Sequence, residues 1–323
     1  MEYTNLYVDG AWREGSDGTR FDVINPWDES VLASVASASL EDANDALDAA
    51  HAAFADWAGR TPRERSVVLR RAWELMTERL EDFARLITLE NGKARADAIG
   101  EATYAAEFFR WFSEEAVRID GLISHAPASG ARIIVQHKPA GIAVLVTPWN
   151  YPAAMGTRKI APALAAGCPV IIKPASETPL TMLALMPLLE EAGVPKGVVN
   201  VLPSRNTGKM VDMMLHDPRV RVVSFTGSTE VGRKLLHSAA DQVLKPAMEL
   251  GGNAPLIVFE DADLDVAIEG TMLAKMRNLG EACTAANRIY VHDDIREAYI
   301  ERLSAAMSAL KVGDGLDPTV NVG

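Results

Sequence analysis

The sequence between residues 141 and 259 alternates short apolar runs with segments of helical composition. The runs are rich in Val and Ile and are too short for helices, as is typical of strands buried on both faces. Helical stretches of about ten residues or more separate them, which is the pattern of consecutive βαβ units. The sequence therefore predicts an α/β fold with a doubly wound parallel sheet. Its strands are expected at residues 142–146, 170–173, 198–202, 220–225 and 255–259.

The region before this alternation is predicted to be mainly helical. Apolar residues spaced three and four apart follow Ser39 and end at Trp57, which predicts one amphipathic helix. Thr61-Pro62-Arg63-Glu64 combines an N-cap, a first-turn proline and a capping-box glutamate, so a second helix begins there. A further helix is predicted over residues 94–119. Its apolar side is expected at Tyr104, Phe108 and Trp111.

Turn signals define the remaining elements. Asp9-Gly10 between alternating residues predicts a hairpin. Residues 121–130 predict a turn, and residues 131–136 predict a weakly alternating strand. From about Gly251 the sequence predicts a strand, a long helix, a loop that contains Cys283, another strand and a final helix.

Length and charge exclude several classes of protein. The chain has 323 residues, which suggests two domains at roughly 150 residues each. A content of 48% hydrophobic and 24% charged residues is typical of a folded globular protein and not of a disordered one. The formal net charge is −12, and an acidic surface repels phosphate backbones and anionic lipids. We therefore expect neither a nucleic-acid partner nor a membrane partner.

Cysteine and histidine usage bears on compartment and metals. Two cysteines cannot form a disulfide framework and indicate a reducing compartment, so we expect a cytoplasmic protein. The first residues lack the basic and apolar parts of a signal peptide, and prolines and basic residues interrupt the longest apolar region. The six histidines lie far apart in the sequence, so we expect no metal site.

The two cysteines differ in their surroundings. Cys283 lies in a loop of small residues before a predicted short helical stretch. A thiol near a helix N-terminus ionises more easily and is a better nucleophile. Cys168 lies in the apolar segment 164–170, and we expect it to be a small buried hydrophobe.

Two candidate binding groups follow predicted strands, where ligands bind in open α/β sheets. Lys173 ends the run 170–173, although a solvated lysine at a strand end is the simpler interpretation. Gly227-Ser228 lies where a strand meets a helix, a position that favours a phosphate, although Ser228 is equally well explained as an N-cap. The usual G-x-G-x-x-G dinucleotide fingerprint is absent.

Two further residues are candidates for the chemistry itself. Glu249 stands between an apolar residue and a double glycine, where partial burial would raise its pKa toward that of a useful base. Otherwise it is a surface glutamate at a strand end. Asn150 lies between Pro148 and Pro152 in a stiff loop, and its amide could donate a hydrogen bond to a developing oxyanion. A lone asparagine there is more often a turn residue.

In their order along the chain, these segments resemble the aldehyde dehydrogenase superfamily over essentially the whole length. Each motif is weak alone, but five in the family's order make a coincidence negligible. The five are Pro148-Trp149-Asn150-Tyr151-Pro152, Lys173-Pro174-Ala175-Ser176-Glu177-Thr178-Pro179, Phe225-Thr226-Gly227-Ser228, Glu249-Leu250-Gly251-Gly252 and Gly280-Glu281-Ala282-Cys283.

The resemblance implies a catalytic role for three residues. Cys283 would attack the aldehyde carbon to give a thiohemiacetal, and Asn150 with the Cys283 backbone N–H would form the oxyanion hole. Glu249 would then activate the water that hydrolyses the thioester. The implied cofactor is NAD or NADP, and the implied partner is a small-molecule aldehyde. The implied cofactor-binding residues are Thr147, Pro148, Trp149, Lys173, Ser176, Glu177, Gly227, Ser228 and Gly251.

The resemblance also implies a division of the chain. Residues 1–120 and 138–249 would form a Rossmann-like cofactor domain, and residues 121–137 part of a bridging and oligomerisation hairpin. Residues 250–323 would form an incomplete α/β catalytic domain, because the family places a further catalytic segment and an interface strand later in the chain. We therefore expect a C-terminally truncated form of an enzyme that is a homodimer or homotetramer at full length, and we expect the truncated chain not to turn over alone.

Cofactor preference depends on the position three residues after Lys173. Many NAD-using members of the family carry Glu there, whereas this chain has Ser176, followed by Glu177. A carboxylate would repel a 2′-phosphate, and a serine hydroxyl can donate to it. We therefore predict that NADP is accepted, unless Glu177 turns inward and restores a preference for NAD.

Two arginines bear on the substrate. Arg158 follows the Asn150 loop, and Arg277 lies six residues before Cys283. Two guanidinium groups suit a substrate with a distal carboxylate, and the local sequences resemble succinate-semialdehyde dehydrogenases. Succinic semialdehyde is therefore the expected substrate. The alternative is that one or both arginines make surface ion pairs.

The chain departs from the family pattern at two positions. Glu281 stands where the family usually has Gln, which is expected to raise the pKa of the nearby thiol. Residue 285 is Ala, so a paired-thiol redox switch has no second cysteine. Three alternatives stay open: a dehydrogenase for another aldehyde, a truncated non-catalytic relative, and an acyltransferase, for which the sequence shows no acyl-carrier site.

Overall fold

The computed structural model describes residues 3–323, and its centre is a seven-stranded sheet in the order β11-β10-β7-β8-β9-β1-β2. The strands from β11 to β9 run parallel, and β1 and β2 add an antiparallel hairpin at one edge, joined through the predicted Asp9-Gly10 turn. The chain order reverses between β7 and β10, so the predicted doubly wound parallel sheet is confirmed. The bounds are β1 Leu6–Val8, β2 Ala11–Arg13, β7 Ile142–Val146, β8 Val170–Lys173, β9 Val199–Val201, β10 Val220–Thr226 and β11 Lys245–Glu249.

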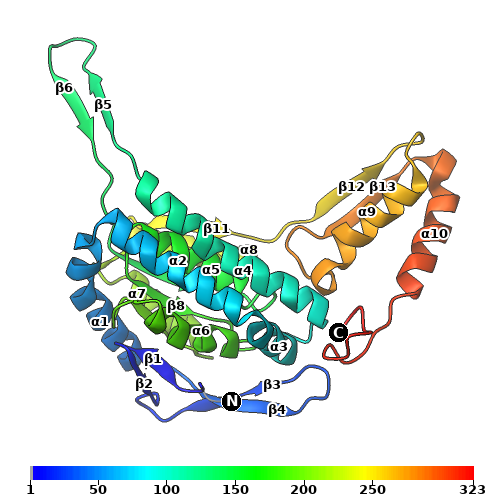
Figure 1. Ribbon diagram of the computed structural model, residues 1–323, viewed down its shortest axis with the longest axis horizontal. Coiled ribbons are helices and arrows are strands. Elements are labelled where there is room, and N and C mark those ends of the chain that lie inside the picture. Colours follow the sequence, from blue (N-terminus) through cyan, green and yellow to red (C-terminus); the bar gives the residue numbers. More distant parts are fainter. Residues whose placement is uncertain (1–2) are drawn as a thin grey trace.

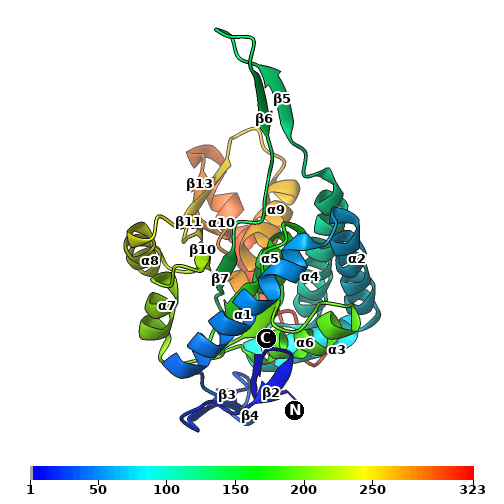
Figure 2. The ribbon, with the colours of Figure 1, turned by 90° about the vertical axis from the view of Figure 1, so that its left-hand side faces the viewer.

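Helices cover both faces of the sheet, as Figure 2 shows with α2 and α4 on one side and α7 and α8 on the other. Alternate residues of β7 serve the two layers, because Val144 packs with one core and Leu145 with the other. One layer contains α2 (Pro62–Glu78), α3 (Leu80–Asn91), α4 (Arg95–Glu115), α5 (Ala154–Ala165) and α6 (Leu180–Glu191). The other contains α1 (Leu40–Gly59), α7 (Thr207–Leu215) and α8 (Thr229–Asp241).

The predicted helix starts are confirmed. Ser39 and Thr61 each accept the N3 backbone N–H in a capping box, and Pro62 occupies the first turn of α2. The predicted apolar side of α4 is wrong for Tyr104 and Trp111, whereas Phe108 packs against the core as predicted. Trp111 is 55% exposed, whereas the small residues Ala102, Ala105 and Ala106 are buried together with Phe109. Alanine lets α2 and α5 approach α4 closely, so the size of the side chains misled the prediction.

Two hairpins lie outside the main sheet. β3 (Arg20–Ile24) pairs with β4 (Val31–Ala36), and β5 (Leu122–His125) pairs with β6 (Arg132–Val135). Figure 1 shows the β5–β6 hairpin projecting away from the body, after a short 3-10 turn at Ala116–Arg118. The predicted strand at 131–136 is confirmed, but the predicted turn over 121–130 contains β5. The sequence does not signal β5, because this strand is held in place by pairing with β6 and not by burial in a hydrophobic core.

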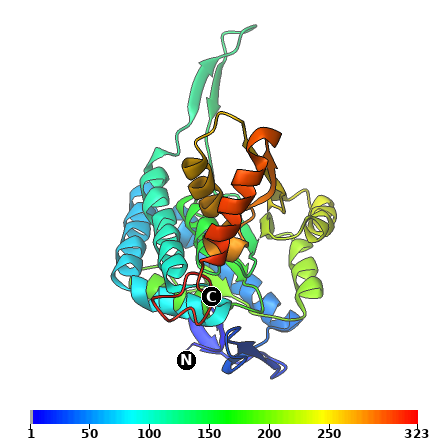
Figure 3. The same cartoon turned by 90° about the vertical axis from the view of Figure 1, so that its right-hand side faces the viewer.

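The last part of the chain forms a separate small unit (Figures 1 and 3). Here β12 pairs in parallel with β13 and not with the main sheet, so the expectation that the strand at 255–259 belongs to the doubly wound sheet is wrong. A short helical turn η2 precedes the Cys283 loop, and another, η3, precedes α10. The bounds are β12 Ala254–Val258, α9 Leu264–Met276, η2 Arg277–Gly280, β13 Ala286–Val291, η3 Asp293–Ile295 and α10 Arg296–Ser308. Within residues 3–323, no helix has the length and apolar character of a membrane span.

Candidate active site

A cavity of about 520 Å³ opens where the carboxyl ends of the parallel strands face α4, α5 and the Cys283 loop. This position is the crevice in which open α/β sheets bind ligands, because the order of the strands reverses there. Asn150, Arg158, Arg277 and Cys283, four of the residues predicted from the sequence, line it together.

The two cysteines are both free, and they differ in the predicted way in burial. Cys168 is 5% exposed in the core, so its expected structural role is confirmed. Cys283 is exposed at the cavity. It lies in a turn that leads directly into β13 and not into a helix, so the expected helix N-terminus at the thiol is wrong.

Asn150 is held against the loop that carries the thiol. Its side-chain amide donates a hydrogen bond to the carbonyl oxygen of Glu281 at 2.8 Å. Its own backbone oxygen accepts from the side chain of Asn278 at 3.0 Å. The asparagine is therefore more than a turn residue, because it ties the loop after β7 to the segment before Cys283.

The chain reverses sharply just before the thiol. Asn278, Leu279 and Gly280 have φ values of 55°, 60° and 74°, all in the left-handed region. This conformation is strained for Leu279, whereas asparagine tolerates it and glycine adopts it freely. The Asp97 carboxylate accepts the Asn278 backbone N–H at 2.9 Å. Burial raises the pKa of Asp97, and this N–H opposes the rise.

Glu249 ends β11, an edge strand that the sequence did not predict. Its backbone oxygen accepts the Gly227 N–H at 3.0 Å. The turn that follows passes close to Cys283, because a Cβ on Gly252 would lie 3.2 Å from the Cys283 oxygen. The Glu249 side chain is exposed, so the expected partial burial is wrong. The sequence pattern of β11 did not predict a strand, because the segment contains Pro246 and its side chains are mostly exposed.

The arginines enter the cavity from two elements. Arg158 lies on α5, with its guanidinium carbon 6.0 Å from the centre of the Phe108 ring. Arg277 follows α9 and is exposed. Among residues 3–323, neither guanidinium lies within 4.0 Å of a carboxylate, so the surface ion pairs of the alternative interpretation are not formed. Both cations line the cavity, where the Asp97 carboxylate attracts Arg277 at longer range.

A second open cavity, of about 760 Å³, contains part of the predicted cofactor set. Trp149, Ser176 and Glu177 line it, together with Arg205, which the sequence did not single out. The Ser176 hydroxyl donates to the Glu177 carboxylate at 3.2 Å. Lys173 ends β8 nearby and is 6% exposed. Burial lowers the pKa of Lys173 to about 8, with Glu177 opposing.

The remaining cofactor positions lie at the ends of β7, β10 and β11. The Thr147 N–H donates to the Lys173 oxygen at 3.2 Å and so fixes the loop that continues through Pro148. Ser228 caps α8 by accepting the Val231 N–H at 3.3 Å, as its simpler interpretation expects. A Cβ on Gly227 would lie 2.4 Å from the Phe225 ring, whereas one on Gly251 would meet only the Thr229 hydroxyl, at 4.0 Å.

Sequence reasoning missed three buried charged residues at the site. Lys159 is 6% exposed on α5 and donates to the Ser224 hydroxyl at 2.8 Å. Burial lowers its pKa to about 8, helped by Arg158 and opposed by Glu249. Lys93 and Glu101 form a fully buried ion pair beside Asn150. Helical spacing could have found Lys159, which lies four residues after the buried Met155.

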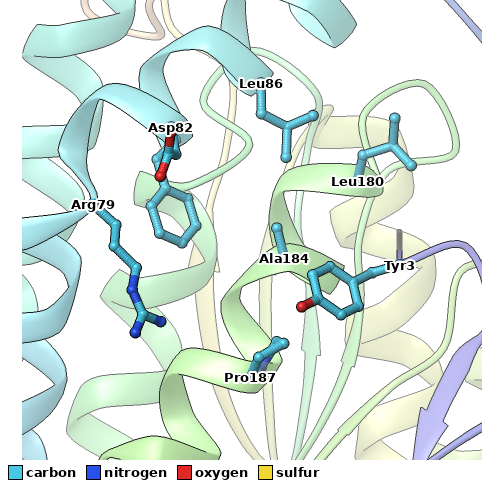
Figure 4. Close-up of a pocket in the computed structure, with 8 residues that line it drawn as sticks. Tyr3, Arg79, Asp82, Leu86, Leu180, Ala184 and Pro187 are labelled. Carbon is cyan, nitrogen blue, oxygen red and sulfur yellow. The ribbon is translucent and has the colours of Figure 1, made fainter. Parts of the chain in front are cut away.

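Another cavity, of about 330 Å³, lies between α3 and α6. Figure 4 shows that Asp82 and Leu86 reach it from α3, and Leu180 and Ala184 from α6, with Tyr3 closing one side. None of the predicted site residues lines it. Across residues 3–323, no cluster of three or more His, Cys, Asp or Glu side chains could hold a metal ion.

The chain matches the model of the aldehyde dehydrogenase family over residues 12–323. It is 54% identical to a succinate-semialdehyde dehydrogenase of Paenarthrobacter nicotinovorans, over 91% of this chain and 65% of the relative. It is 46% identical to a glutarate-semialdehyde dehydrogenase of Pseudomonas aeruginosa, over 98% of this chain and 65% of the relative. This chain thus spans about two thirds of the length of these relatives.

A solved structure has the same fold. The crystal structure of an E. coli NADP-dependent enzyme superposes with a TM-score of 0.97 at 46% identity, covering 99% of this chain and 66% of the other. The shared sequence and the shared arrangement of the strands therefore lead to one conclusion. The chain belongs to the aldehyde dehydrogenase family.

Proposed function

We propose that this chain carries the catalytic residues for the NAD(P)-dependent oxidation of a carboxylate-bearing aldehyde, succinic semialdehyde in the first place, to the acid. The observation that carries the proposal is one cavity that holds an accessible thiol, an amide donor and two cations free of carboxylate partners. A thiol with an adjacent hydrogen-bond donor suits covalent catalysis at a carbonyl carbon.

The proposed chemistry begins at Cys283. Its sulfur adds to the aldehyde carbon to give a thiohemiacetal, whose oxygen would accept hydrogen bonds from the Asn150 amide and the Cys283 N–H. In the structure that amide donates to the Glu281 oxygen, so substrate binding must exchange this partner. When bound, the nicotinamide cofactor supplies the hydride acceptor, and the carbon is then held on Cys283 as a thioester.

Glu249 is proposed as the base for the second half of the reaction. Its carboxylate would take a proton from the water that attacks the thioester, which releases the acid and the free thiol. Exposure at the end of β11 leaves this carboxylate in contact with solvent, and the close approach of Gly252 to the Cys283 oxygen keeps it near the thiol loop.

The cofactor residues fit a dinucleotide. Lys173 is 6% exposed and is attracted by the Glu177 carboxylate, and within residues 3–323 its ammonium forms no hydrogen bond or ion pair, so it can donate to a ligand. We propose that it holds the adenosine ribose, with the loop 147–149, Gly227, Ser228 and Gly251 around the phosphates. We further propose that NADP is accepted, because the Ser176 hydroxyl can exchange its bond to Glu177 for one to a 2′-phosphate and the cation Arg205 lines the same cavity.

The cofactor proposal is tested by titration with each dinucleotide. Ser176→Glu is expected to weaken NADP binding by about tenfold or more and to leave NAD binding within about twofold, because a carboxylate repels the 2′-phosphate. Arg205→Ala is expected to act in the same direction. Equal losses for NAD and NADP would contradict the assignment of these residues to the 2′-phosphate.

The substrate proposal rests on Arg158 and Arg277. Arg277→Ala is expected to raise the KM for succinic semialdehyde roughly tenfold to a hundredfold, the value of a lost charge-assisted hydrogen bond, and to leave butanal nearly unchanged. Lys275→Ala, on the preceding turn of α9, is the matched control. Equal effects on both aldehydes would instead favour a dehydrogenase for a neutral or amino aldehyde.

Turnover itself is tested by the absorbance of reduced cofactor with succinic semialdehyde and NAD or NADP. Cys283→Ala is expected to abolish the signal, whereas Cys168→Ala, in the core, should keep it. A folded chain that gives no signal with either cofactor would favour the second candidate, a non-catalytic relative.

We also propose that residues 1–120 and 138–249 form the cofactor domain, that 121–137 form a bridging hairpin and that 250–323 belong to the catalytic domain.

Exposed apolar side chains on the hairpin, Ile123 at 73% and Ile134 at 64%, support a homodimer or homotetramer through this element. Sedimentation of the wild type and of Ile123→Ser tests this. We propose a cytoplasmic location, which fits two free cysteines.

A further inference from the structure

Lys93 lies in the bend between α3 and α4, and its side chain is fully buried. Its ammonium donates to three oxygens: Glu101 Oε2 at 2.5 Å, the Asn150 backbone oxygen at 3.0 Å and Asn278 Oδ1. All three donors of the ammonium are thereby used. Buried ion pairs stabilise little in net terms, so this arrangement calls for another explanation than stability.

The partners of Lys93 reach three separate parts of the site. Glu101 Oε1 accepts the backbone N–H groups of Ala153 and Ala154 at 2.8 and 3.2 Å, at the start of α5. The N-cap residue of α5 is Ala153, whose side chain cannot accept a hydrogen bond from these N–H groups. Through this carboxylate, Lys93 is connected to the N-terminus of the helix that carries Arg158.

The second connection runs to the segment before the thiol. The Asn278 side chain accepts from Lys93 and donates to the Asn150 oxygen at 3.0 Å, so each of the three residues contacts the other two. Asn278 is 1% exposed. Left-handed Leu279 costs on the order of 1 kcal/mol or more, and such strain persists only where the surroundings over-determine it.

A third contact holds the bend from outside. The Arg95 N–H donates to the Gly315 oxygen at 2.9 Å, and a Cβ on Gly315 would lie 2.6 Å from the Lys93 oxygen. The end of the chain thus packs against the backbone of this bend, beside α4 in Figure 1. Lys93 is fixed at its backbone as well as at its ammonium.

We propose that Lys93 is a positioning residue, which through Glu101 and Asn278 holds the Asn150 loop and the Cys283 loop at a fixed separation. This inference rests on the proposed function, because it assigns Lys93 to the alignment of the proposed nucleophile with its oxyanion donor. We name Lys93, Glu101, Asn150 and Asn278 the buried lysine network. Misplacement of reacting groups by about 1 Å can cost on the order of a hundredfold in rate.

The test uses two variants that avoid an unpaired buried charge. Lys93→Met together with Glu101→Gln removes both charges, while the glutamine oxygen can still accept from the start of α5. Asn278→Gly keeps the left-handed backbone accessible and removes only the side-chain contacts. The matched control is Lys234→Met with Glu230→Gln, an exposed ion pair on α8.

Amide hydrogen exchange is the first readout, because it does not depend on turnover. Both variants are expected to exchange about tenfold faster over residues 277–284, while β7 and β8 stay protected as in the wild type. The control pair should change neither region. Unchanged exchange at 277–284, or faster exchange over the whole chain, would overturn the proposal, since the network would then be dispensable or merely structural.

The pre-steady-state burst of reduced cofactor is the second readout. Its rate constant is expected to fall about tenfold to a hundredfold in both variants, while the KM for the cofactor stays within about twofold. A proportional change in the burst rate constant and in the KM for the cofactor would overturn the positioning role. If the wild type reduces neither cofactor, the proposed function fails for this chain, and the exchange result alone decides whether the network orders the loop.

Discussion

The strands β7 and β8 and the strand β12 are all short and apolar, yet their burial differs. Every residue of β7 and β8 is buried, because helices cover both faces of the main sheet. In β12 burial alternates, and Ile257 is 61% exposed. Both β7–β8 and β12–β13 are parallel pairs, so the difference lies in what covers them. A parallel sheet with one bare face is uncommon and marks a surface that another polypeptide segment would cover.

The small unit also differs in its outer surface. Phe259 and Tyr290 are more than half exposed, and so are Val266 and Leu273 on α9. Several large exposed apolar side chains in so small a unit are more typical of an interface than single exposed apolar residues are. The proposed thiol lies in this less covered unit, while the proposed cofactor residues lie on the fully covered sheet. The site therefore spans two regions of different expected stability.

The largest effect is expected from one substitution made in both regions. Ile172→Ala, at a position that is 0% exposed, should lower the free energy of unfolding by about 2–5 kcal/mol, the cost of a lost side chain plus a cavity. Ile257→Ala should change it by less than about 0.5 kcal/mol. Urea denaturation measures both. A similar loss at the two positions would show that the second face of β12 is covered in solution.

A pH effect on stability is expected in the covered region. Glu90 is buried and accepts the N–H groups of Leu180 and Thr181, at 2.7 and 2.8 Å, as a cap for α6. Burial raises its pKa from 4.5 to about 7, opposed by these hydrogen bonds. The folded state thus binds the proton more tightly than the unfolded state, so stability falls as the pH rises from about 4.5 to 7.

Glu90→Gln should remove this dependence, which amounts to about 3 kcal/mol at most. The measurement is the free energy of unfolding between pH 4.5 and 8, and Glu230→Gln, on the surface, is the control. A variant whose stability kept the wild-type slope would show that Glu90 titrates near its ordinary pKa.

Helix caps compare the regions at a smaller scale. Ser39→Ala removes the cap of α1 and is expected to lower the stability of the main body by about 1 kcal/mol. Asp263 caps α9, because its side chain accepts hydrogen bonds from two backbone N–H groups, and Asp263→Ala removes this cap. We expect faster amide exchange confined to α9 and an unchanged main transition. A shift of the main transition by Asp263→Ala would mean that the two regions unfold as one unit.

The smallest expected effect on stability is at the bare surface. Phe259→Ser should change the free energy of unfolding by less than about 0.5 kcal/mol, yet reduce the binding of a hydrophobic dye and any self-association. Light scattering and dye fluorescence check both. Val23→Ser, buried in the core, is the contrasting variant and should destabilise the fold instead.

The sequence by itself determined the elements whose signals are local. The βαβ alternation, the Asp9-Gly10 hairpin and the capped starts of α1 and α2 follow from hydrophobic period and from side chains that satisfy nearby backbone groups. The candidate residues Asn150, Arg158, Arg277 and Cys283 were identified by their place beside such elements together with the resemblance of their motifs to a known family.

Only the tertiary structure decided which of these residues share a cavity and which faces are covered. The burial of Ala105 in place of Trp111, the edge strand β11 and the exposure of Glu249 depend on neighbours that are distant in sequence. The same is true of Lys93, whose partners lie 8, 57 and 185 residues away. A local pattern fixes how a segment folds, but the burial and pairing of a charge are set by whatever the rest of the chain packs against it.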